Sequence, residues 1–194
     1  DGFGADVDVD YRTMTDPLVY EQSELCAAPS RCVRSTRSLV WSMKGVENLF
    51  TTYKYRDARV DGRSGRTLGF TEVESHIHLF DVDITHRTYY DTVSQTHDPQ
   101  APFYVGNPAA TTFAGFPFVG EVLAQTVTIH DKTTDRWYVD STQREVELRG
   151  SGIDSYYVVP KVIRQRYWDL GVGVAPTPQT LTTPPLRTIE TRFE

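Results

Sequence analysis

The chain has 194 residues, which suits one domain or one domain with extensions. Its net charge of −6 and the absence of grouped stacking aromatics among its basic residues argue against nucleic-acid binding. No apolar run approaches the roughly 18 residues that a membrane-spanning helix requires. Abundant Thr, 11 Tyr and 9 Phe favour strands over helices, so composition predicts a mainly β protein.

Acidic side chains dominate residues 1–24, and we expect an extended arm there. Asp6, Asp8 and Asp10 alternate as at the start of a calcium loop, but the glycine and glutamate that such a loop needs further on are missing. An edge strand with one charged face is the better interpretation. Residues 31–66 are strongly basic. The two segments are either ordinary solvated surface, or the acidic arm docks on a basic face of its own or a neighbouring subunit.

Cys26 and Cys32 lie six positions apart, with a proline and small residues between them. This spacing favours a small disulfide loop over a metal site, which typically uses a CxxC pair and further ligands. Two unpaired thiols in a cytosolic protein are the alternative. A disulfide, together with a chain that opens on Asp1 rather than Met, predicts a processed protein that is secreted and located outside the cell or in a virion.

A helix is expected over about 36–50, because Leu39, Met43, Val46 and Phe50 recur at intervals of three and four residues. The apolar stripe predicts a helix that packs against a sheet.

The stretch from Phe70 to Ile84 has the clearest strand pattern in the chain. Alternation places Glu72, Glu74, His76 and His78 on one face. The alternation changes phase after Leu79, which predicts a β-bulge near Leu79–Phe80. Further strands, joined by Gly- and Asp-containing turns, are expected over 53–60, 87–94, 121–130, 136–148 and 154–166.

Two later segments are rich in proline and aromatic or threonine residues. The segment 113–119 contains Phe113, Phe116 and Phe118, which either anchor a loop in the core or form an exposed contact site. The segment 171–194 carries Pro and Thr and is expected to be an extended, polyproline-like arm. Its apolar anchors would be Leu186, Ile189 and Phe193.

These elements predict an antiparallel β-barrel or sandwich with one packed α-helix and extended N- and C-terminal arms. The acidic arm would cover residues 1–24, the β-rich domain 25–170 and the Pro/Thr-rich arm 171–194.

Motifs for nucleophilic catalysis, phosphate binding and dinucleotide binding are absent from the sequence. One constellation of metal-binding residue types remains, in which His76 and His78 are followed by Asp83. It resembles the first metal motif of cupin barrels, with Asp in place of the usual Glu and with His130 on a later strand as the fourth ligand. The resemblance implies a secreted barrel that binds a divalent metal or small ligand, with enzymatic activity as one option.

The favoured hypothesis is a non-enzymatic structural subunit of an extracellular or virion-type assembly without a cofactor. Its terminal arms would hold it to other protein subunits, in a homo-oligomer or a larger assembly. The contacts would come from the acidic arm, the Phe-rich segment and the C-terminal anchors, namely Asp6, Asp8, Asp10, Phe113, Phe116, Phe118, Leu186, Ile189 and Phe193.

Overall fold

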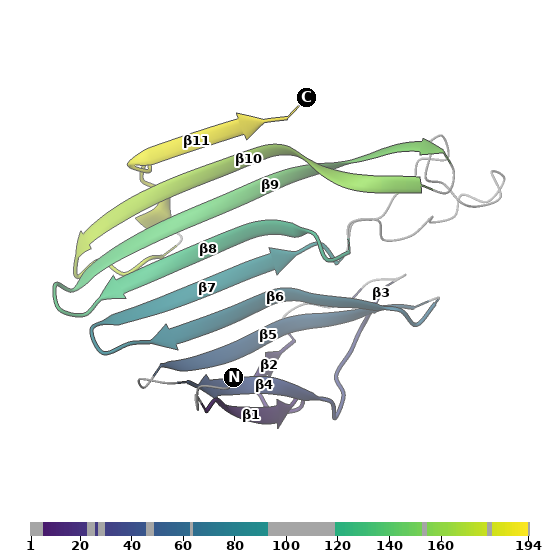
Figure 1. Ribbon diagram of the computed structural model, residues 1–194, viewed down its shortest axis with the longest axis horizontal. Coiled ribbons are helices and arrows are strands. Elements are labelled where there is room, and N and C mark those ends of the chain that lie inside the picture. The colour runs from purple at the N-terminus through teal and green to yellow at the C-terminus, as the bar shows by residue number, and fades with distance from the viewer. Residues whose placement is uncertain are drawn as a thin grey trace.

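A computed structural model shows that the protein forms one open β-sheet (Figure 1). It describes residues 6–22, 26, 30–45, 49–62, 64–92, 119–152, 155–177 and 180–193. The sheet has 11 strands, and the main path runs from β1 at one edge to β11 at the other. The predicted barrel or sandwich is therefore wrong, because the first and last strands of this path do not pair with each other.

The strands vary widely in length. Their bounds are β1 Asp8–Thr13, β2 Tyr20–Glu21, β3 Ser30–Cys32, β4 Ser38–Lys44, β5 Phe50–Asp61, β6 Thr67–His78, β7 Val82–Tyr90, β8 Val122–Asp131, β9 Arg136–Gly152, β10 Ser155–Val172 and β11 Arg187–Arg192. A short 3₁₀ helix, η2, covers Thr180–Thr182.

Strands β5 to β10 form an antiparallel meander in which each strand pairs with the next strand in the chain. The β8–β9 turn shows why the chain reverses. The Asp131 carboxylate accepts hydrogen bonds from the backbone N–H groups of Thr133 and Thr134, and Asp135 adopts a φ of 51°. The turn predicted at this place is confirmed.

The predicted helix over 36–50 is wrong, because Ser38–Lys44 forms strand β4. Leu39 and Met43 are four residues apart, a spacing that fits both a helix face and alternate positions of a strand. Trp41 lies two residues from each of them, so in a strand all three side chains share one face. Leu39 and Trp41 both pack against the buried core. The Gly45 N–H donates to the carbonyl of Leu49 at 2.8 Å, which closes the turn into β5.

The predicted bulge at Leu79–Phe80 is a hairpin turn that separates β6 from β7. The Leu79 N–H donates to the Val82 carbonyl at 2.9 Å. A hairpin changes the phase of alternation as a bulge does, but it also reverses the chain. His78 therefore lies directly opposite Asp83 on the neighbouring strand.

The main buried core lies where the N-terminal segment meets β5. Strand β5 is paired along one edge by three short strands in succession, first β4, then β2 in parallel orientation, then β3. Met14, Val19, Tyr20 and Ala58 are buried there, and Val33, Leu39, Trp41, Tyr55 and Phe70 pack around them. The N-terminal arm is thus part of the sheet, with β1 as an edge strand paired to β4.

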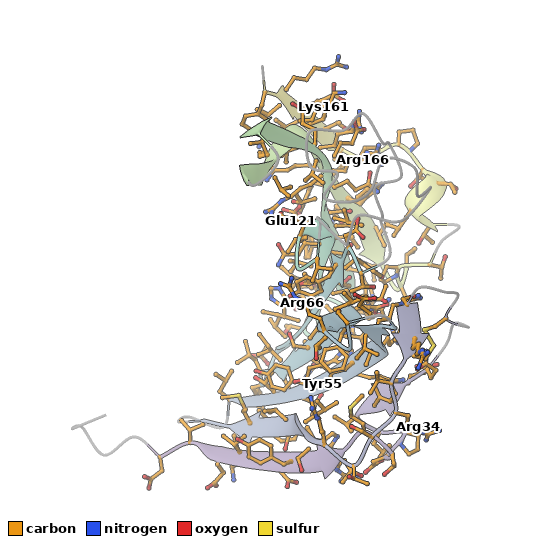
Figure 2. All side chains as sticks on the ribbon, turned by 90° about the vertical axis from the view of Figure 1, so that its right-hand side faces the viewer. Arg34, Tyr55, Arg66, Glu121, Lys161 and Arg166 are labelled. Atoms are coloured by element: carbon orange, nitrogen blue, oxygen red, sulfur yellow. A yellow bond between two sulfur atoms is a disulfide. The ribbon has the colours of Figure 1, made fainter. Side chains whose placement is uncertain are left out.

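The Pro/Thr-rich segment after β10 folds back over one face of the sheet, as Figure 2 shows edge-on in yellow. The backbone N–H of Thr177 donates to the Thr180 hydroxyl, and the N–H of Thr180 donates to the Thr177 hydroxyl. The indole N–H of Trp168 donates to the carbonyl of Thr183 at 3.0 Å. The sequence did not predict this path, in which these local bonds turn the Pro/Thr-rich segment back toward the sheet. The chain then forms β11 on the outer edge of β10.

A disulfide joins Cys26 to Cys32, as the spacing predicts. Closing so short a loop stabilises the folded state by about 2 kcal/mol through the entropy of the unfolded chain. Cys32 is the last residue of β3, which pairs with the far end of β5. The disulfide therefore constrains the segment that covers the main core.

Candidate functional site

Four charged side chains form a cross-strand cluster on β5, β6 and β7, which we call the charged ladder: Arg56, Glu72, Glu74 and Arg87. Arg56 lies opposite Glu72, and Glu74 lies opposite Arg87. Arg56 donates through Nη1 to Glu72, and Arg87 donates through Nε to Glu74. Opposite charges at directly facing positions stabilise neighbouring strands.

The two carboxylates of the charged ladder are buried, and their pKa values move in opposite directions. Burial alone would raise the pKa of Glu74, but a hydrogen bond from His76 and the charge of Arg87 outweigh it and lower the pKa to about 2. For Glu72 burial prevails over the charge of Arg56, and the pKa is raised. Glu74 is consequently a permanently ionised partner for the arginines at neutral pH.

The ladder extends outward to the N-terminal segment. Glu21 accepts from the Lys54 ammonium at 2.8 Å and from Arg56 at 3.3 Å. The hydrogen bond from Lys54 is the main reason that the pKa of Glu21 is lowered. These exposed contacts tie β2 to β5, but pairs of this kind contribute little to stability.

The histidines singled out from the sequence lie near one another without converging. His78, Asp83 and His130 occupy facing positions on β6, β7 and β8. His78 Nδ1 lies 3.1 Å from Asp83 Oδ1, and the Lys132 ammonium lies 2.8 Å from the same oxygen. His130 turns instead to Asp135, at 2.9 Å.

His76 is held within the sheet by two neighbours. Its Nε2 lies 2.6 Å from Glu74 and its Nδ1 lies 2.9 Å from the Thr85 hydroxyl. Over the described ranges, no group of three His, Cys, Asp or Glu side chains is arranged to hold a metal ion. The metal site based on His76, His78, Asp83 and His130 stays a prediction.

The other predicted contact residues lie mostly at the ends of the sheet. Asp8 and Asp10 belong to β1, and Asp6 precedes it on the surface. Leu186, Ile189 and Phe193 lie in or beside β11 and are exposed. Phe113, Phe116 and Phe118 lie outside the described residues.

A cavity of about 320 Å³ lies between the sheet and the folded-back C-terminal segment, and we call it the roofed cavity. Its floor comes from β7, β8 and β9, and its roof comes from the segment that follows β10. The lining residues are Thr85, Arg87, Tyr89, Thr126, Thr128, Trp137, Pro176, Thr177 and Leu181.

Sequence reasoning missed the roofed cavity, although part of its signal was present. Thr85, Arg87 and Tyr89 alternate along one strand and so share one face. The sequence did not indicate that the segment with Pro176 and Leu181 folds back over that face.

The main path of the sheet ends at β1 on one side and at β11 on the other, while β2 and β3 pair only with β5. Lys161 lies opposite Phe193, whose N–H donates to the Lys161 carbonyl at 3.0 Å. Hydrogen-bonded and non-hydrogen-bonded pairs alternate in antiparallel sheets. Phe193 is a hydrogen-bonded position, so Thr191 and Ile189 are hydrogen-bonded positions as well. The backbone N–H and C=O groups of the residues between them, Thr188, Glu190 and Arg192, therefore point away from β10, toward the outside of the sheet.

No helix in the described ranges has both the length and the hydropathy to cross a bilayer.

Comparisons with protein-family models, curated proteins and solved structures find no match to this chain.

Proposed function

We propose that this protein is a non-enzymatic structural subunit of an extracellular assembly, and that its terminal edge strands join it to neighbouring subunits. The observation that carries the proposal is the open sheet, whose main path ends in a strand from each terminal segment, β1 and β11 (Figure 1). An open edge presents unpaired N–H and C=O groups that another strand can pair with.

The charges of the two edges suit a head-to-tail contact between copies of the chain. Strand β1 carries Asp8, Asp10 and a single Arg12, whereas β11 carries Arg187, Arg192 and a single Glu190. Pairing β11 of one copy with β1 of the next would bring opposite net charges together. Such a heterologous contact repeats from copy to copy, so it builds a ring or a filament.

The disulfide supports an extracellular location. Cys26 and Cys32 are bonded, and structural disulfides persist mainly in oxidising compartments. A subunit of an extracellular assembly also gains from a covalent link that constrains the segment over its core.

Thr188→Pro tests the role of the β11 edge. Proline removes the outward-pointing N–H of residue 188 and keeps every bond between β11 and β10, so we expect an intact fold and loss of assembly. Native mass by light scattering measures assembly, and thermal unfolding measures the fold.

Ile189→Pro is the matched control, since the N–H of residue 189 faces Gln165 of β10. This variant should lower the unfolding temperature, whereas Thr188→Pro should not. An unmodified protein that stays monomeric at all concentrations, or a particle unaffected by Thr188→Pro, contradicts the proposal.

A further inference from the structure

Arg87 is the one charged side chain among the described residues that line the roofed cavity, and Glu74 on the neighbouring strand β6 holds its guanidinium. Its Nε donates to Glu74, and Glu74 also accepts from His76. Among the described residues, Arg87 has no hydrogen bond from its two terminal nitrogens. A guanidinium anchored through Nε presents these nitrogens as a planar fork, which matches the two oxygens of a carboxylate.

The charges of Arg87 and Glu74 together favour one type of anion. Among the described residues that line the cavity, Arg87 is the only charged one, and the ionised Glu74 to which it donates reduces the local positive potential. A single negative charge is therefore better matched than the double charge of a phosphate monoester. We expect a monocarboxylate.

Hydroxyl groups surround the arginine on the cavity floor. Thr126 lies opposite Arg87, and Thr128 lies opposite Thr85, so that three threonines occupy the two adjoining rows. A hydroxyl can donate one hydrogen bond and accept two. The Thr85 hydroxyl already bonds His76, and the remaining capacity suits a ligand that itself carries several hydroxyls.

Aromatic and apolar groups complete the lining. Trp137 stacks on His130 with ring centroids 4.0 Å apart, which fixes the indole on one side. Tyr89 borders the same space, and burial raises its pKa, so its phenol stays protonated. Pro176 and Leu181 border the cavity on the side of the roof. A pyranose ring offers apolar C–H groups on its faces and hydroxyls on its edges, and this lining can contact both.

We propose that the roofed cavity binds a monosaccharide acid, with the carboxylate on Arg87, the hydroxyls on the threonines and a ring face against the aromatic and apolar side chains. A volume of about 320 Å³ is close to the lower end of known ligand pockets, which suits one sugar ring rather than a chain of sugars. This binding site is independent of the sheet edges and of assembly.

The test compares glucuronate and galacturonate with glucose and galactose, using calorimetry and NMR on the full chain. We expect both acids to bind at millimolar concentration and both neutral sugars to bind at least about tenfold more weakly. Resonances of Thr126, Thr128 and the Trp137 indole should shift on addition of the acids. Neutral sugars that bind equally well, shifts located elsewhere, or no binding of either acid would overturn the proposal.

Arg87→Lys is the decisive variant, because lysine keeps the charge and loses the planar fork. It should weaken binding of the acids by about tenfold. Arg164→Lys is the matched control, since Arg164 is also held by carboxylates on neighbouring strands but lies outside the cavity. Equal affinity in Arg87→Lys and the unmodified protein contradicts the role of Arg87. If Arg87→Lys does not fold, the NMR shifts of the unmodified protein decide the question.

Discussion

Replacing Tyr20 with alanine should lower the free energy of unfolding by about 3–5 kcal/mol, the usual cost of removing a buried aromatic side chain. Tyr20 is 2% exposed and belongs to the main core. Its hydroxyl accepts from the Ala58 N–H at 3.1 Å and lies 2.9 Å from the Val33 carbonyl, to which it donates. The side chain therefore joins β5 to the segment that covers it. Denaturant unfolding followed by circular dichroism measures the change.

Two further tyrosine variants separate the contributions. Tyr20→Phe keeps the ring but leaves the Ala58 N–H without its partner, so about 1–3 kcal/mol should be lost. Tyr11→Ala is the control, because Tyr11 is exposed on the edge strand β1, and its removal should change stability by less than about 0.5 kcal/mol. Equal losses for Tyr20→Ala and Tyr11→Ala would show that this core does not hold the N-terminal segment.

Acid should destabilise the sheet through Glu74. The folded-state pKa of Glu74 is lowered from 4.5 to about 2. A lowered acid pKa gives stability that is fully present above the unfolded-state value and is lost as pH falls through the folded-state value. The loss should fall between pH 4.5 and pH 2, with an upper size of about 3 kcal/mol.

Glu74→Gln isolates this contribution. Glutamine cannot ionise, so the variant should be less stable at neutral pH and should approach the unmodified protein near pH 2. Glu72 acts in the opposite direction, because its pKa is raised by burial, and its contribution remains in both proteins. Unfolding free energies of the two proteins across the acid range provide the measurement. A difference that stays constant with pH would mean that Glu74 is not the responsible group.

The sequence predicted most strands correctly and failed where two patterns share a spacing. Strands after residue 120 have alternating apolar residues and turns with Gly or Asp, and the structure has them close to the expected positions. Leu39 and Met43 are compatible with both a helix and a strand, so the interpretation depended on Trp41 between them. The phase change after Leu79 was likewise compatible with a bulge or a hairpin. Local pattern alone does not separate these cases.

Sheet closure and the position of the termini could not be predicted from local pattern. Whether a meander closes into a barrel depends on strand tilt and stagger, which residue types do not determine. The Pro/Thr-rich composition predicted extended chain but not its path. The reciprocal bonds of Thr177 and Thr180 turn the segment back, and it then pairs with β10 as strand β11. For the candidate site, alternation correctly placed Glu72 and Glu74 on one face, but their partners Arg56 and Arg87 come from strands whose register only the structure defines.

The pairing of β5 with three short strands in succession, β4, β2 and β3, has a consequence for the order of folding. Hairpins from β5 to β10 connect neighbours in sequence, whereas Val19, Tyr20 and Val33 bond to Tyr55 and Ala58, more than 20 residues away in the chain. Contacts between near neighbours form faster. We therefore expect the amides of Tyr55 and Ala58 to gain protection after those of the central hairpins in pulsed hydrogen exchange. In refolding of the whole chain, the N-terminal segment would therefore reach its native place after the central hairpins have formed.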